Sequence, residues 1–280
     1  MIRTVQLSEI TENIKEMCIE ANHFLSPDMK KVFDEAAASE ESPLGRQILG
    51  QLEENLCIAG EEMIPICQDT GMACVFIELG QDAHIDGDLT DAVNEGVRRG
   101  YENAFLRKSI TADPLQRVNT GDNTPAFLTV HLVPGSGCKI TVAPKGAGSE
   151  NMSRLGMLKP ADGEKGVREF ILSAVEKAGP NPCPPIIVGV GIGGTFDKCA
   201  QLSKFALMRT VGSRHPDPSY AAMERELLDE INRMDIGPAG LGGRTTALAV
   251  HIETYPTHIA GLPVAVNLCC HAYRHAHAVL

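Results

Sequence analysis

Hydrophobic residues recur at helical spacing through the first sixty residues of the chain. In two segments the apolar side chains share one helical face: Ile10, Ile14, Met17, Cys18 and Ala21 in the first, and Ile48, Leu49, Leu52 and Leu56 in the last. Helix-start signals stand at Ser8, Ser26-Pro27 and Ser42-Pro43. The pattern predicts three helices that form a helical N-terminal layer over residues 1–60.

Beyond residue 62 the pattern changes to short β-rich runs that alternate with helical stretches. It predicts strands at 73–79, 126–133, 139–144, 186–190, 246–253 and 263–268, and helices at 91–105, 164–178, 196–208 and 219–233. Segments 126–133 and 139–144, joined by Pro-Gly-Ser-Gly, are typical of a β-hairpin. With no linker or internal repeat, the sequence predicts a single mixed α/β (α+β) domain over residues 1–280.

Composition and charge narrow the classes of partner. The 280 residues are 43% hydrophobic and 22% charged, which is ordinary for a globular protein. The net charge of -11 disfavours nucleic acid and anionic membranes as partners, so an anionic substrate needs a locally basic pocket. No apolar run is long enough to cross a bilayer and the first residues are too polar for a signal peptide, so we expect a cytoplasmic protein.

The nine cysteines indicate reduced thiols, since their number is odd and they are spread through apolar segments. No CxxC pair is present, which argues against structural zinc. Three cysteines fall in predicted loops that are suited to metal ligands: Cys67 in PICQDTG, Cys183 in NPCPP and Cys270 in LCCHA. Any one of the nine can also be a small buried hydrophobic residue.

Six strings occur in order over nearly the whole chain: PICQDTG, LRKSITADPL, RVNTGDNTPA, PKGAGSEN, CPPIIVGVGIGGT and THIAGLPVAVNLCCHA. Together they resemble the class I (iron-sulfur) fumarate hydratase and L-tartrate dehydratase family, and in particular the alpha subunit of its two-subunit form. The resemblance implies a hydro-lyase that interconverts fumarate and L-malate, with L-tartrate dehydration as the alternative. It also implies a separate beta subunit, and an α2β2 assembly is the arrangement we expect.

The resemblance implies a [4Fe-4S] cluster whose ligands are Cys67, Cys183 and Cys270. A cluster held by only three thiolates leaves one iron open to act as a Lewis acid on a hydroxyl or carboxylate oxygen. Cys269 is an alternative third ligand, because two cysteines stand where the family pattern has one. Cys270 is preferred because it precedes His271 as in the family's CHA string, and strand alternation predicts that Cys269 points inward.

The resemblance also names residues that contact the substrate. It implies that Gln68 and Asp69 bind the dicarboxylate, that Asp69 carries a proton, and that Arg107 grips a carboxylate through its planar guanidinium. Gly148 would present its N–H to a carboxylate oxygen, and His258 would act near the substrate in catalysis. From the residues alone, Asp69 can instead form an Asx-turn in Asp-Thr-Gly, and His258 can be a hydrogen-bonded core residue.

Two readings from other classes compete with the hydro-lyase. Residues 189–194 fit the G-x-G-x-x-G motif of nicotinamide-dependent enzymes, follow a predicted strand and precede a helix, and Asp217 stands roughly twenty residues later. Against this reading, the motif lies late in the chain without a clear βαβ repeat. The second alternative is a non-catalytic scaffold that carries a cluster, since single-chain members of the family have a further C-terminal domain.

Overall fold

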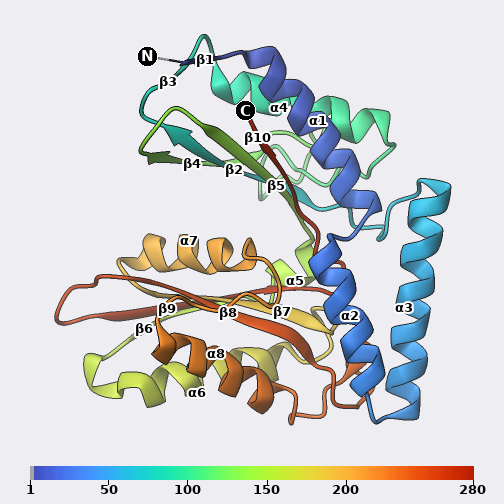
Figure 1. The fold of residues 1–280 in the computed structure, drawn as a ribbon, viewed down its shortest axis with the longest axis vertical. Coiled ribbons are helices and arrows are strands. Elements are labelled where there is room, and N and C mark those ends of the chain that lie inside the picture. Colours follow the sequence, from blue (N-terminus) through green and yellow to red (C-terminus); the bar gives the residue numbers. More distant parts are fainter. Residues whose placement is uncertain (1–2) are drawn as a thin grey trace. The chain divides into compact units, whose positions relative to one another are not determined.

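The structure, a computed structural model, describes residues 3–280 (Figure 1). Its helices are α1 Leu7–His23, α2 Pro27–Ser39, α3 Pro43–Glu62, α4 Leu89–Asn103, α5 Ala147–Glu150, α6 Gly163–Ala178, α7 Phe196–Leu207 and α8 Pro218–Ile231. Its strands are β1 Arg3–Val5, β2 Met72–Gly80, β3 Ala83–Ile85, β4 Phe127–Val133, β5 Cys138–Lys145, β6 Arg154–Leu158, β7 Ile186–Gly193, β8 Ala247–Tyr255, β9 Leu262–Cys269 and β10 Ala276–Val279. The mixed α/β class predicted from the sequence is confirmed.

The described residues group into two compact units. Unit 1 contains residues 3–26, 55–147 and 274–280, and unit 2 contains residues 27–54 and 148–273. The single domain expected over residues 1–280 stays a prediction. The three helices expected in the first sixty residues are present as α1, α2 and α3. No helix within residues 3–280 is both long enough and apolar enough to span a membrane.

Unit 1 is built on a four-stranded sheet in the order β10-β5-β2-β4, with α1 and α4 on one face (Figure 1). Alternate residues of β2, Ala73, Val75 and Ile77, are buried with Ile140 and Val142 of β5 against these two helices. The apolar stripe of α1 predicted from the sequence supplies the other side of this core. A short parallel pair, β1 with β3, accompanies the sheet.

The β-hairpin predicted from segments 126–133 and 139–144 is wrong. Strands β4 and β5 do not pair with each other, because β2 lies between them, parallel to β4 and antiparallel to β5. The connection at 134–137 passes over the end of β2, where the Gly80 N–H donates to the Gly137 carbonyl at 2.8 Å. Gly80 allows this crossing, since a Cβ there would lie 2.3 Å from the Gly135 carbonyl oxygen.

Unit 2 contains a second four-stranded sheet in the order β6-β9-β7-β8. Helices α6 and α8 cover one face and α7 the other, which gives three layers (Figure 1). Valine, isoleucine and leucine side chains of β7, β8 and β9 pack against α6 and α8 in a single core. Strands β7 and β8 are parallel, whereas β9 runs antiparallel to β7. The end of β9 therefore lies beside the start of β7.

The glycines of the G-x-G-x-x-G motif have a packing role in β7. Gly189 and Gly191 lie inside the strand and not in the turn that follows it. A Cβ on Gly189 would lie 2.3 Å from the Ser203 carbonyl oxygen of α7, and one on Gly191 would lie 2.1 Å from the Cys199 carbonyl oxygen. These glycines let α7 approach the sheet closely. Asp217, the acidic residue of the dinucleotide reading, accepts the Ser219 N–H and caps α8, so neither feature argues for a nicotinamide cofactor.

Candidate active site

The loop that carries Cys67 joins α3 to β2 in unit 1 and is held by hydrogen bonds on both sides of the cysteine. The Ile66 N–H donates to the Asn22 carbonyl at 2.9 Å. Beyond Cys67, the buried Tyr101 hydroxyl donates to the Thr70 carbonyl at 2.7 Å. Because these anchors belong to α1 and α4, the core of unit 1 fixes the backbone around Cys67, which is itself half-buried.

Both carboxylate oxygens of Asp69 accept backbone hydrogen bonds. Its Oδ1 accepts the Gly71 N–H at 3.0 Å, which is the Asx-turn considered from the sequence. Its Oδ2 accepts the Ala147 N–H at 2.9 Å, and a Cβ on Gly146 would lie 3.1 Å from the same oxygen. Asp69 therefore joins the Cys67 loop to the segment after β5. The geometry gives Asp69 a structural role in addition to the role in proton transfer expected for it.

Arg107 and Gln68 lie on the exposed side of the same region of unit 1. The Arg107 carbonyl accepts the Thr70 hydroxyl at 3.1 Å, so its backbone is tied to the Cys67 loop. Within residues 3–280 the Arg107 guanidinium makes no ion pair and the Gln68 amide makes no hydrogen bond. Both side chains are available to a ligand, and Arg107 supplies the positive charge that a dicarboxylate requires.

Asn123 is a positioning residue that the sequence did not single out. Its side chain is fully buried, its φ is +63°, and its Nδ2 donates to the Gly71 carbonyl at 3.2 Å. Its Oδ1 accepts the Ser109 N–H at 2.6 Å. Asn123 thus connects the 107–125 loop to the end of the Cys67 loop and fixes the start of the segment that follows Arg107. The Asn-Thr-Gly-Asp-Asn-Thr-Pro string belongs to the family resemblance, but it gave no signal for this contact.

In unit 2, Cys183 and Cys270 come from neighbouring strand ends. Cys183 precedes β7, Cys270 follows β9, and the antiparallel register pairs Ile187 with Cys269. The Cys183 carbonyl accepts the His271 N–H at 3.3 Å and lies 3.1 Å from His271 Nδ1. Cys183 is exposed and has a φ of +53°, a conformation that is uncommon outside glycine and is enriched at functional sites.

Gly148 lies in the neighbourhood of Cys183. It is exposed in the short helix α5, and a Cβ on it would lie 3.7 Å from the Asn181 carbonyl oxygen. Cys183 Sγ lies 4.0 Å from the same carbonyl oxygen. Helix α5 is held from its other side by Glu150, whose Oε2 accepts the Asn267 amide of β9 at 2.8 Å. Unit 2 therefore brings Gly148, Cys183 and Cys270 together.

Exposure separates the cysteines into two groups. Five are buried: Cys18, Cys74, Cys138, Cys199 and Cys269. Burial raises the pKa of the Cys18 thiol to about 12 and also raises the pKa of Cys138 and Cys199. Cys67, Cys183 and Cys270 belong to the less buried group, together with Cys57 on α3. No three His, Cys, Asp or Glu side chains within residues 3–280 form a group that could hold a metal ion, and Cys67 belongs to a different unit from the other two.

His258 is not near the cysteines of unit 2. It lies in the exposed loop between β8 and β9, where the neighbouring Thr257 hydroxyl donates to the Gly194 carbonyl at 3.0 Å, just beyond the end of β7. Cys183 stands at the opposite end of β7, and eight residues of strand span about 23 Å. The expected role of His258 in catalysis receives no support from this placement.

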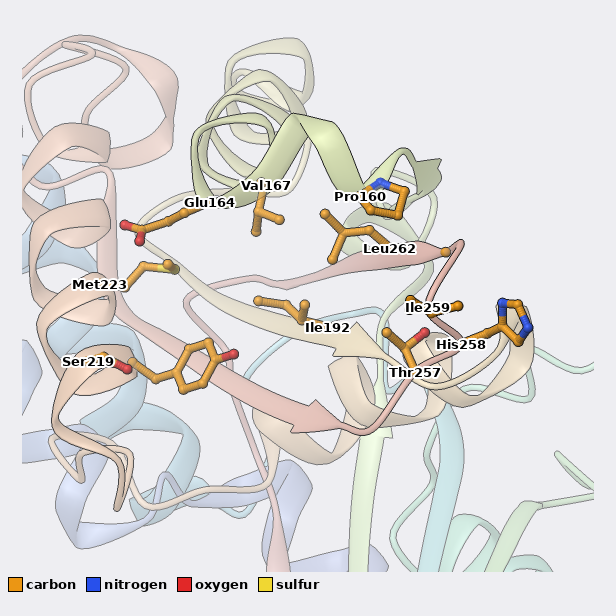
Figure 2. A pocket seen from close by; sticks show the side chains of 13 residues that line it. Pro160, Glu164, Val167, Ile192, Ser219, Met223, Thr257, His258, Ile259 and Leu262 are labelled. Carbon is orange, nitrogen blue, oxygen red and sulfur yellow. The ribbon is translucent and has the colours of Figure 1, made fainter.

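His258 lines a different cavity, a pocket of about 440 Å³ between α6, α8 and the β8–β9 loop (Figure 2). Its floor is apolar, with Val167, Ile192, Met223 and Leu262 pointing inward. The only charged carboxylate on its wall is Glu164, and none of the lining residues is Lys or Arg. A pocket of this kind is unsuited to a dicarboxylate, because nothing in it would compensate the charge.

Comparison with known proteins identifies the family. The family model described as fumarate hydratase (Fumerase) matches residues 11–279. The chain belongs to this family. It is 41% identical over 276 residues to a protein named as a candidate L(+)-tartrate dehydratase subunit alpha from Methanocaldococcus jannaschii, with 96% of each chain covered. It is 33% identical over 273 residues to the L(+)-tartrate dehydratase subunit alpha of Escherichia coli strain UTI89, with 96% of this chain and 89% of the relative covered.

Proposed function

We propose that the chain is the alpha subunit of a [4Fe-4S]-dependent hydro-lyase that removes water from a small hydroxy-dicarboxylate. The observation that carries the proposal is the pair of accessible thiols at adjacent strand ends, Cys183 and Cys270, in a chain that belongs to the fumarate hydratase family. Membership in this family makes hydro-lyase chemistry the expected activity. The scaffold and nicotinamide readings have no comparable support.

L-tartrate is the favoured substrate, because the similar chains are named as tartrate dehydratase subunits. Loss of water from L-tartrate gives the enol of oxaloacetate, and loss of water from L-malate gives fumarate. Both substrates have four carbons and two carboxylates, so the same carboxylate-binding side chains can hold either one. The hydration of fumarate to L-malate is the second candidate, supported by the family model.

Thiolate is the ligand type that iron-sulfur clusters use, and the chain offers three cysteines that are not buried, at strand ends of its two units. Cys67, Cys183 and Cys270 are proposed as the ligands, since all three sit in loops at the ends of strands and none is buried. Cys270 is proposed in preference to Cys269, because Cys269 is 5% exposed and lies within β9. When bound, the cluster would supply a Lewis-acidic iron for a substrate oxygen.

The side chains of unit 1 would bind and orient the dicarboxylate. Arg107 is proposed to hold one carboxylate through two parallel N–H donors, and Gln68 to donate to a carboxylate or hydroxyl oxygen. Gly148 of unit 2 is exposed and has no side chain, so its N–H is proposed to donate to a carboxylate oxygen. Asp69 is proposed to contact the substrate and to carry a proton. Proton transfer would require one of its carboxylate oxygens to give up a backbone hydrogen bond and bind the substrate instead.

A beta subunit is proposed as the partner. The similar chains are named as alpha subunits, and a partner could supply the base that dehydration needs for a carbon-bound proton. A covering partner would also exclude water and oxidants from the site. An α2β2 assembly is the expected stoichiometry.

The test is an anaerobic assay of L-tartrate and L-malate dehydration, using the reconstituted chain with and without the subunit encoded beside it. We expect activity only with both subunits, and a larger kcat/KM for L-tartrate. Activity of the isolated chain would defeat the two-subunit proposal. A cluster-loaded pair that acts on neither diacid would favour the scaffold.

A further inference from the structure

Arg274 is a buried cation in unit 1 that stands two residues before β10. Its side chain is 3% exposed, and its Nη2 donates to the carbonyl oxygen of Asp69, two residues beyond Cys67. Its other two nitrogens, Nε and Nη1, have no accessible surface to water and no hydrogen-bond partner within residues 3–280. A guanidinium normally places all its N–H groups on acceptors when it is buried.

No negative charge compensates Arg274 in the part of the chain that the structure describes. The guanidinium makes no ion pair with any carboxylate of residues 3–280. Burial and, less strongly, Cys18 raise the pKa of the buried Tyr101 phenol. The positive charge of Arg274 acts in the opposite direction and lowers that pKa. A buried and unpaired charge is in general strongly destabilising. Such a charge is therefore expected where an anion arrives later.

We propose that Arg274 is the counter-charge for the Cys67 thiolate and the iron-sulfur cluster that it would hold. This inference rests on the proposed function and assigns Arg274 as a positioning residue, not a catalytic one. One donor already fixes the backbone at Asp69, two residues beyond Cys67, and the other two nitrogens of the same guanidinium have no acceptor among the described residues. Hydrogen bonds to cluster sulfurs and nearby charge are the terms that set a cluster's reduction potential.

The proposal predicts opposite behaviour in the empty and the loaded protein. Without the cluster, Arg274 is an uncompensated charge, so removing it should cost the empty protein little stability. With the cluster bound, the same removal leaves negative charge uncompensated in a region of low dielectric. A merely structural role, in which Arg274 only anchors the Asp69 carbonyl, predicts the reverse order of effects.

The experiment compares Arg274→Met, which keeps length but removes the charge, with Arg274→Lys, which keeps the charge. Arg99→Met serves as the matched control, since Arg99 is an exposed arginine of α4 paired with Glu95. For each chain one measures the unfolding midpoint without metal, iron bound after anaerobic reconstitution, the rate of iron release to a chelator, and the reduction potential by electron paramagnetic resonance titration.

For Arg274→Met we expect an unfolding midpoint within error of wild type without metal, iron release faster by about 10- to 100-fold, and a more negative reduction potential. Arg274→Lys should restore most of the retention and the potential, and Arg99→Met should match wild type. A lowered midpoint in the empty protein with unchanged iron release and potential would overturn the inference. If wild-type chain takes up no cluster, the proposed function itself fails, which is a distinct result.

Discussion

The backbone N–H of His271 donates to the carbonyl oxygen of Cys183 at 3.3 Å, across 88 residues of chain. The contact exists because β9 ends where β7 begins, and it fixes the residue after Cys270 beside Cys183. The spacing of the two cysteines carries no signal of its own in the sequence. Their proximity is a product of antiparallel pairing inside unit 2.

The three proposed ligands should be separable from the other cysteines by substitution. Cys67→Ser, Cys183→Ser and Cys270→Ser should each lose the cluster, seen as loss of brown colour and of about four irons per chain after anaerobic reconstitution. Cys269→Ser should retain it if Cys270 is the ligand. Cys57→Ser is the matched control for an accessible thiol, and Cys199→Ser for a buried one. Retention of full iron by Cys183→Ser would remove Cys183 from the ligand set.

Arg107 should matter for the reaction and not for folding. Removing a bidentate contact to a carboxylate costs about 2–4 kcal/mol of transition-state binding, so Arg107→Ala should lower kcat/KM by roughly thirty- to a thousand-fold. The measurement is steady-state kinetics with the beta subunit and a confirmed cluster. Lys108→Ala is the adjacent control and should leave kcat/KM near wild type. Wild-type kinetics in Arg107→Ala would reassign the residue to the surface.

Glu40 should make unit 2 sensitive to acid. Glu40 is 2% exposed, and this burial by itself raises the pKa of its carboxylate. The carboxylate accepts hydrogen bonds from the backbone N–H groups of Ser42, Arg244 and Thr245. These hydrogen bonds outweigh the effect of burial and lower the pKa to about 2. Because the folded-state pKa lies below the usual value of 4.5, this stabilisation is present above about pH 4.5 and is lost as the pH falls toward 2.

Replacing Glu40 tests this directly. Glu40→Gln should lower the free energy of unfolding at pH 7 by on the order of 3 kcal/mol, and the difference from wild type should shrink between pH 4.5 and 2. Urea titrations at several pH values measure both effects. Glu41→Gln is the control, since the Glu41 side chain is 82% exposed. An equal loss for both variants at every pH would contradict the assignment.

The close approach of α7 to β7 should make Gly191 intolerant of any side chain. In Gly191→Ala the new Cβ would meet the Cys199 carbonyl oxygen at 2.1 Å, so we expect a loss of about 3 kcal/mol or more in the free energy of unfolding. Gly50→Ala is the matched control in unit 2, because nothing lies within 4 Å of its Cβ position in α3. That variant should gain about 0.5–1 kcal/mol.

Much of the secondary structure could be predicted, because periodicity is a local property. Helices α4, α6, α7 and α8 begin within two residues of their predicted starts, and β7 begins at its predicted residue. The prediction of a β-hairpin was wrong because the turn residues at 134–137 carry no information about β2, which lies between β4 and β5 in the sheet. Strand β6, Arg154–Leu158, was missed because five residues with a central glycine show no clear alternation.

The candidate site was predictable in its residue types and less so in its geometry. Motif strings named Cys183, Cys270 and Gly148, and only the fold shows that these three are neighbours in unit 2. The same strings named His258, which the β8–β9 loop carries to the far end of the sheet. Arg274 was not found at all, because a buried charge without a partner is visible only when every neighbour is known.

The position of β10 has a consequence for how the protein is made. Its four residues pair with β5, and flanking backbone bonds join Leu280 to Cys138, so the sheet of unit 1 requires residues 274–280 although its other strands lie before residue 146. On the ribosome, residues 148–273 must all emerge while that sheet still has an open edge at β5. An open strand edge invites pairing with other chains. We therefore expect nascent unit 1 to depend on a chaperone, or on fast completion of translation, until β10 can pair with β5.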